Sequence, residues 1–145
     1  MRKPVVVTLL ASLLLGACAT VVPLQRAQLA SLSRDSRPAE VEAAIGQATA
    51  KWSFNLDHAG RSHAVRVFDL RVGSSTQMMT FCTPNCFIVP TQVPVNATFV
   101  LVQAAESKQL LAWGTLEELA KDADPAVSGL AAPVRGRIAA LEKAK

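Results

Sequence analysis

The sequence predicts an α+β fold, with short helices at both ends of the domain and a small antiparallel β-sheet between them. Apolar residues follow a helical period over residues 36–46 and the alternating period of strands between residues 51 and 114. The helical period returns after residue 115. Helices, then strands, then helices is the order typical of α+β proteins.

Residues 1–17 have the features of a secretory signal peptide. A basic start, Met1-Arg2-Lys3, precedes the apolar run PVVVTLLASLLLGA. That run is shorter than the roughly 18–20 residues that a membrane-spanning helix needs, and small residues end it. The alternatives are an uncleaved anchor or a buried core helix, but no stop-transfer pattern follows.

Leu15-Gly16-Ala17-Cys18 resembles the lipobox of bacterial lipoproteins. The resemblance implies cleavage before Cys18, a diacylglycerol thioether on its sulfur and acylation of the new N-terminus. Ala19 follows in place of Asp, which implies sorting to the outer membrane, with the domain facing the periplasm. Because one acyl chain alone anchors a protein only marginally, three chains would hold it firmly. We expect residues 18–35 to be a lipidated N-terminus and tether, and residues 36–145 a single domain.

The charge of the chain gives little support to nucleic-acid binding. The formal net charge is +4, and removal of Arg2 and Lys3 with the signal peptide reduces it to +2. No cluster of Lys and Arg interleaved with aromatic residues is present in the sequence. We therefore expect no nucleic-acid partner.

Two short helices are expected at the start of the mature chain. Residues 24–32 carry a partial apolar stripe. Residues 36–46 should form the second helix, with Ser36 as its N-cap, Pro38 in its first turn and Gly46 at its end. Its expected buried face comprises Val41, Ala44 and Ile45.

The middle of the chain is expected to form the sheet. The expected strands are residues 51–56, 62–72, 78–81, 87–90, 97–103 and 109–114. In the second strand the apolar residues change face between Val67 and Phe68, which predicts a bulge or burial on both faces. The segment GSSTQ, residues 73–77, should end that strand.

The C-terminal part is expected to be helical. Thr115 and Glu118 have the spacing of a capping box, which predicts a helix start. Asp124-Pro125 should begin a second short helix, and Pro133 a last one that extends through Leu141.

Two segments resemble small outer-membrane lipoproteins of the BamE-like (SmpA/OmlA) group. The first is PAEVEAAIGQAT, with Val41, Ile45 and Gly46, although Ala48 stands where proline is usual. The second is FVLVQAAESKQLLAWGTLEELAKDAD, and its matching residues are Phe99, Leu101, Leu110, Leu111, Trp113, Gly114 and Glu118. The resemblance implies a helix pair packed on a small antiparallel sheet and a non-catalytic scaffolding or adaptor role in outer-membrane assembly or integrity. We expect an envelope-protein partner to contact Phe99, Leu101 and Trp113.

Cys82 and Cys86 are the cysteines left beside Cys18, and the BamE-like group does not share their loop. An even pair in an oxidising compartment favours a disulfide, and Pro84-Asn85 is suited to the turn that would close it. The alternative is a periplasmic metal- or thiol-binding module that adds Met78, since thiolates and thioethers suit Cu(I). Met79 should point to the opposite face of the strand.

No enzyme, cofactor or resident metal is expected from the remaining residues. His58 and His63 flank a turn and are expected to be exposed to solvent. A hydrolase would need one of them beside a serine, but the sequence has no Gly-x-Ser-x-Gly elbow and no glycine-rich phosphate loop. Trp52 and Trp113 are expected to be core aromatics, with partner contact as the alternative for Trp113 if it is exposed.

Overall fold

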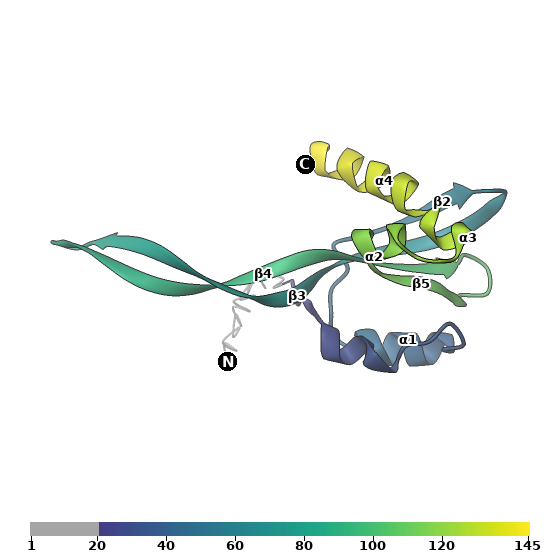
Figure 1. Ribbon diagram of the computed structural model, residues 1–145, viewed down its shortest axis with the longest axis horizontal. Helices are drawn as coiled ribbons and strands as arrows, with labels where there is room; N and C mark the ends of the chain where they lie inside the picture. The colour runs from purple at the N-terminus through teal and green to yellow at the C-terminus, as the bar shows by residue number, and fades with distance from the viewer. Residues whose placement is uncertain (1–20) are drawn as a thin grey trace, which may run out of the picture.

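The computed structural model describes residues 21–145 and has the expected α+β class (Figure 1). The signal peptide, Cys18 and the residues up to Thr20 lie outside the described part. The elements are β1 (Leu24–Gln25), η1 (Arg26–Ser31), α1 (Pro38–Ile45), β2 (Trp52–His58), β3 (Arg61–Cys82), β4 (Cys86–Ala104), β5 (Leu110–Thr115), α2 (Leu116–Ala120), α3 (Pro125–Ser128) and α4 (Ala131–Lys143).

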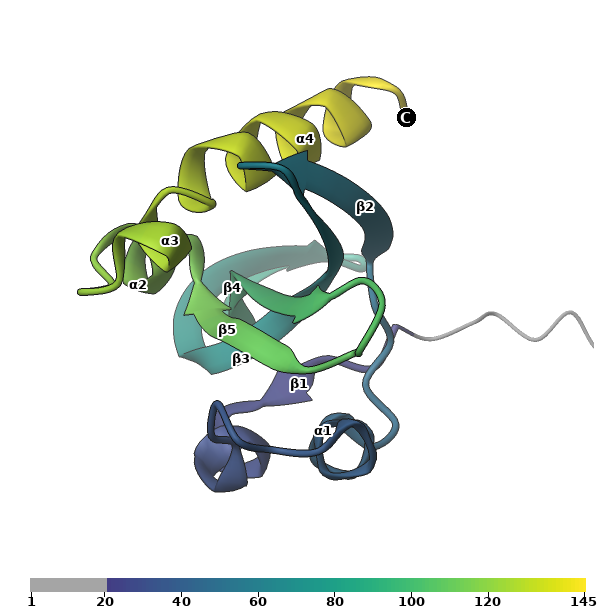
Figure 2. The same ribbon diagram turned by 90° about the vertical axis from the view of Figure 1, so that its right-hand side faces the viewer.

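The body of the molecule has three layers, in which one five-stranded sheet lies between two layers of helices (Figure 2). The strand order is β1-β3-β4-β5, and β2 pairs with β3. All pairings are antiparallel except that of β1 with β3. The 3₁₀ helix η1 and α1 lie on one face of the sheet, and α2, α3 and α4 lie on the other. From this body β3 and β4 continue as a projecting ribbon (Figure 1).

A separate apolar core fills each face of the sheet. The core under η1 and α1 includes Phe68, Leu70, Phe99 and Leu101, and the core under α2 to α4 includes Val65, Val67, Val100 and Val102. The change of face at Val67 and Phe68 thus reflects burial on both faces, because helices cover both sides of β3 at this point. The register irregularity in β3 lies farther on, between Arg71 and Gly73.

Residues 24–32 belong to the folded domain, so the expected boundary of the tether is wrong. Leu24 pairs with Leu70 of β3, and its side chain is fully buried. Leu29 and Leu32 are buried in the same core. The partial apolar stripe becomes a two-residue strand and a 3₁₀ helix instead of an α-helix, because parallel pairing with β3 extends the backbone at Leu24.

Helix α1 begins one residue later than the expected cap suggests. The Ser36 hydroxyl accepts a hydrogen bond from the Ser33 N–H at 2.9 Å, and Arg37 occupies the N-cap position. The Arg37 N–H donates to the Glu40 carboxylate at 2.8 Å. The expected face of Val41, Ala44 and Ile45 is buried, and Gly46 ends the helix with a φ of 58°. Only the predicted N-cap was wrong.

The segment GSSTQ does not end β3, contrary to expectation. Residues 73–77 pair with residues 91–95 of β4, and the ladder continues to Cys82 and Cys86. Serine and threonine adopt extended backbone readily when a neighbouring strand supplies hydrogen bonds. The pairing across the hairpin therefore determines the structure of this segment.

The C-terminal helices begin close to the expected positions. The Thr115 hydroxyl accepts from the Glu118 N–H at 3.2 Å, and the Glu118 carboxylate accepts from the Thr115 N–H at 2.7 Å. Asp124 caps α3 by accepting from the Ala126 N–H at 3.0 Å. Helix α4 begins at Ala131, so Pro133 still lies in the first turn, where a missing N–H costs no helical hydrogen bond.

Replacing Glu118 with glutamine is expected to make the stability less dependent on pH in the acid range. The hydrogen bond from the Thr115 N–H, together with Arg26, holds the pKa of Glu118 below its ordinary value of 4.5. A carboxyl with a lowered folded-state pKa contributes its full stability above the unfolded pKa and loses it as pH falls through the folded pKa. Urea unfolding at about pH 7 and about pH 3 should show a smaller acid-induced loss for Glu118→Gln than for wild type. An equal acid-induced loss of stability in both proteins would contradict this role of the Glu118 carboxylate.

Candidate functional site

The ribbon formed by β3 and β4 is the most distinctive surface of the molecule. We call residues 72–95 the arm. Among residues 21–145, β3 has no neighbouring strand other than β4 beyond Arg71, and the pairing runs unbroken from Gly73 with Val95 to Cys82 with Cys86. At about 3.3 Å per residue, the arm extends about 35 Å. The arm projects away from the body (Figure 1).

The arm has no charged side chains. Residues 72–105 contain no Asp, Glu, Lys, Arg or His, whereas 18% of the whole chain is charged. Natural proteins usually place charged residues, particularly lysine, on exposed strands, and these charges prevent the strands from pairing with other chains. An uncharged ribbon of this length is therefore better suited to contact with another surface than to simple solvation.

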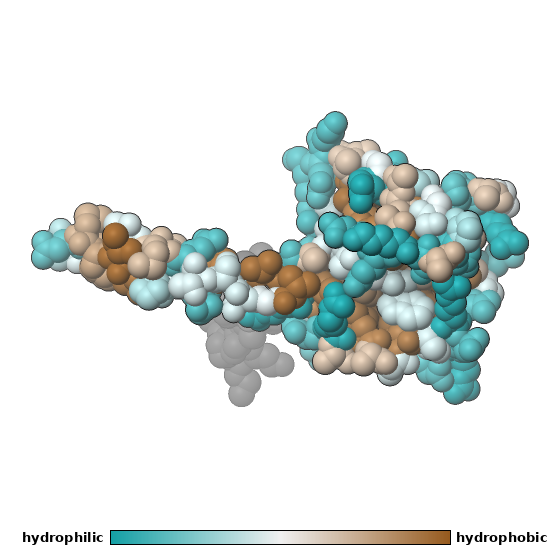
Figure 3. Space-filling view, viewed as in Figure 1, coloured by the Kyte–Doolittle hydropathy of each residue, from teal (hydrophilic) through white to brown (hydrophobic). Residues whose placement is uncertain are grey.

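Large apolar side chains gather near the end of the arm. We call Met78, Met79, Phe81, Phe87 and Ile88 the tip patch. All five are exposed, and Met78 and Ile88 expose 68% and 62% of their surface. Figure 3 shows apolar colouring towards the end of the arm, separated from the body by more polar atoms. A patch of this kind, far from the core, is typical of an interaction site.

The register divides the tip patch between the two faces of the arm. Residues directly opposite each other share a face, so Phe81 and Phe87 lie on the same side. Their rings are stacked with centroids 6.0 Å apart. An aromatic pair of this kind contributes roughly 0.5–1.5 kcal/mol beyond its area burial. The stacking thus holds an aromatic surface in place where no part of the body supports it.

A disulfide closes the end of the arm. Cys82 and Cys86 are the last opposed pair of the ladder, and their sulfur atoms are bonded. In this form neither sulfur is a thiolate ligand. Met78 lies four residues along the strand from Cys82, about 13 Å away at 3.3 Å per residue. Among residues 21–145, no three or more His, Cys, Asp and Glu side chains are grouped to hold a metal. In the disulfide-bonded form, the arm therefore does not bring Met78 together with two thiolates.

Replacing Cys82 and Cys86 together with serine is expected to loosen the arm and leave the body unchanged. The disulfide restricts only the end of a ribbon that is not packed on the core, so its loss should affect local opening. Hydrogen exchange should become faster at amides between residues 78 and 90 and remain unchanged at Val65 and Val100. Equally faster exchange in the core would contradict this assignment.

Two of the expected partner-binding residues are in the core. Phe99 and Leu101 expose 2% and 0% of their surface and pack under η1 and α1, so the expectation that they form a contact surface is wrong. Trp113 is half-buried against the same core. The strands expected at residues 78–81 and 87–90 are confirmed as paired parts of the arm. Their continuation into a long projecting ribbon was not predicted, although the sequence shows the uncharged run from residue 72 to residue 105.

The two histidines differ in their surroundings. His63 is buried, with 7% of its surface exposed, which contradicts the expected solvent-exposed turn histidine. It lines a hollow of about 240 Å³ together with Arg34 and Asp124, and the described residues around this hollow include no serine or cysteine. His58 is half-buried at the end of β2. The structure thus places no serine or cysteine beside His63 in this hollow.

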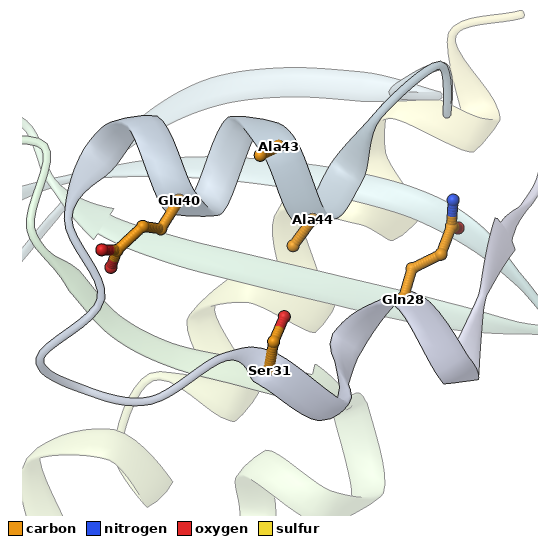
Figure 4. A pocket seen from close by; sticks show the side chains of 5 residues that line it. All are labelled: Gln28, Ser31, Glu40, Ala43 and Ala44. Atoms are coloured by element: carbon orange, nitrogen blue, oxygen red, sulfur yellow. The ribbon is translucent and has the colours of Figure 1, made fainter.

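A larger hollow of about 490 Å³ lies between η1 and α1 (Figure 4). Its lining residues are Gln28, Ser31, Glu40, Ala43 and Ala44. The Glu40 carboxylate accepts hydrogen bonds from the Arg37 guanidinium at 2.9 and 3.0 Å as well as from the Arg37 backbone. These bonds hold the pKa of Glu40 below its usual value. The carboxylate is thereby occupied in starting α1 and is poorly suited to accept a proton from a substrate.

Comparison with known proteins adds no relative to this description. No family model, no curated protein and no solved structure matches the chain. The resemblance to BamE-like lipoproteins therefore stays a prediction.

Proposed function

We propose that the chain is a lipid-anchored protein of the outer membrane with a non-catalytic scaffolding or adaptor role in the cell envelope. The arm is its binding element, and its tip patch contacts an envelope protein. The observation that carries this proposal is the uncharged, projecting ribbon with exposed apolar side chains at its end. Such a surface is costly to expose to water unless a partner covers it.

The path of the chain supports an anchor at the base of the arm. Within residues 21–145, Leu24 is the first buried residue, and it pairs with Leu70, two residues before the arm begins at Val72. Five residues lie between Cys18 and Leu24, so the two positions are six peptide steps apart and at most about 20 Å from each other. A lipid on Cys18 would therefore hold the body close to the membrane, whereas the arm reaches about 35 Å from its base.

In this proposal, the lipid on Cys18 attaches the chain to the membrane. No helix within residues 21–145 combines the length and the hydrophobicity that a membrane crossing requires. The position of η1 and α1 on one face of a mainly antiparallel sheet agrees with the helix pair that the resemblance to BamE-like lipoproteins implies. An adaptor role agrees with that resemblance.

Crosslinking in intact cells tests the proposed role. The full-length chain should capture an envelope protein, and the variant Phe81→Ser/Phe87→Ser should capture several-fold less of it, because the apolar contact at the tip is lost. The control variant Val72→Ser/Val95→Ser removes exposed apolar residues from the base of the arm and should retain capture. Equal capture by the tip variant and wild type, or capture of no envelope protein by wild type, would refute the proposal.

A further inference from the structure

The two long edges of the arm differ in their ability to accept another strand. In β4, Pro90 lies opposite Met78 and Pro94 lies opposite Ser74. Proline has no N–H, so within a ladder it is tolerated where the N–H would point away from the neighbouring strand. The backbone groups of residues 88, 90, 92 and 94 therefore point outward from the arm, and the two prolines remove alternate donors from that edge. The outer edge of β4 is thereby protected from strand addition.

The outer edge of β3 has no such protection. Antiparallel pairs alternate between inward and outward backbone groups, so Ser74, Thr76, Met78 and Thr80 also direct their N–H and C=O groups outward. In the part of the chain that the structure describes, β2 and β1 pair along this edge only as far as Arg71. Between Val72 and Cys82 the edge contains no proline and no charge. It is open to a further strand.

We propose that a second copy of this chain occupies this edge, with its β3 antiparallel to the first. Full overlap of the free edges, from Val72 to Cys82 in each copy, places Ser74 opposite Thr80 and Thr76 opposite Met78 of the second copy. All four positions have outward backbone groups, so each can donate to and accept from its counterpart. The full-overlap register therefore satisfies the hydrogen-bond pattern without any shift.

The side chains also fit the full-overlap register. Phe81 falls opposite Gly73 of the second copy, and a side chain at Gly73 would meet no atom within 4 Å in the single chain. An aromatic ring that covers a glycine on the neighbouring strand is a favourable cross-strand pair. Gln77 faces Gln77 of the second copy at the two-fold axis, where the amides can hydrogen-bond. No like charges oppose each other, because the arm has none.

The difference between the edges favours two copies over a longer assembly. In the pair, the two β3 strands lie at the centre and the two β4 strands at the outside. Both outer edges then carry Pro90 and Pro94, so strand addition stops and the assembly closes with two-fold symmetry. Phe87 and Ile88 lie on β4 and stay available to another partner. The inference therefore goes beyond the proposed adaptor role and depends on neither the lipid nor the envelope protein.

A pair of proline variants of the full-length chain tests this arrangement. Thr76→Pro removes an outward N–H from the open edge, and Gln92→Pro removes one from the edge that is already blocked. Both variants lose the same side-chain hydrogen bond, which Gln92 donates to the Thr76 hydroxyl at 2.8 Å, so only the edge differs. Sedimentation equilibrium of purified protein in density-matched detergent should show a wild-type dimer. The dissociation constant of the dimer should be at least about tenfold higher for Thr76→Pro, because the symmetric pairing loses two backbone hydrogen bonds. It should be unchanged for Gln92→Pro.

Either of two results with the purified chain would overturn the proposal. One is a wild-type chain that stays monomeric over the whole concentration range. The other is equal behaviour of the two proline variants while hydrogen exchange shows that both retain the ladder. A photo-crosslinking residue at position 77 in cells should join two copies of the chain, and a product formed only with a foreign protein would assign the edge to another partner. Because the purified chain is measured alone, failure here is distinguishable from failure of the adaptor role.

Discussion

Replacing Leu101 with alanine is expected to lower the free energy of unfolding by about 3 kcal/mol. Leu101 lies in the middle of β4 with no exposed surface, in the core beneath η1 and α1. Truncation removes apolar burial and leaves a cavity that packed neighbours fill only in part, and both effects destabilise the folded state. Urea unfolding of wild type and variant measures the difference.

Ile88→Ala is the matched control for this substitution. Ile88 lies on the same strand and also loses methylene and methyl groups, but it is exposed on the arm. Its truncation should change the free energy of unfolding by less than about 0.5 kcal/mol. If Leu101→Ala instead left stability unchanged and reduced capture of an envelope protein, Leu101 would be the surface contact that the sequence suggested.

Replacing Cys18 with serine is expected to abolish lipid attachment and outer-membrane location. A serine hydroxyl cannot form the thioether that the lipobox resemblance implies. Each buried methylene contributes roughly 0.8 kcal/mol to anchoring, so loss of the acyl chains removes most of the membrane affinity. Intact mass and membrane fractionation should show an acylated wild-type chain that lacks residues 1–17 and an unacylated variant that retains them.

The double variant Cys82→Ser/Cys86→Ser controls for the loss of sulfur. It removes the other two cysteines and should keep both the acyl mass and the outer-membrane location, since the disulfide lies at the far end of the arm. A wild-type chain with a free thiol at Cys18 and the leader still attached would contradict the anchor.

Local signals in the sequence predicted much of the fold. The alternation from Trp52 to Leu56 predicted β2, and the Thr115–Glu118 capping box marked the start of α2, because each signal depends on near neighbours. The strand at Leu24 was missed because its partner, Leu70, is far away in the sequence. The continuation of β3 through residues 73–77 was missed for the same reason, since β4 supplies its hydrogen bonds.

The candidate site was harder to predict for two physical reasons. Phe99 and Leu101 alternate with Val100 and Val102, and all four are buried because helices cover both faces of the sheet. Burial on both faces leaves no polar alternation to mark the core side. The arm is exposed on both faces, so it also lacks alternation, and its signal is the absence of charge across residues 72–105. That signal depends on composition over a long segment, so the hydrophobic periodicity of the sequence does not reveal it.

Removal of the arm tests most directly whether it is the binding element. Replacing residues 74–94 with Asn-Gly joins Gly73 to Val95, which are opposed in the ladder, through a two-residue hairpin loop. Because both cores lie in the body, this variant should unfold at a urea concentration close to that of wild type. We expect this variant to capture no envelope protein in crosslinked cells while its acyl mass is retained. Undiminished capture by a folded, armless chain would contradict it.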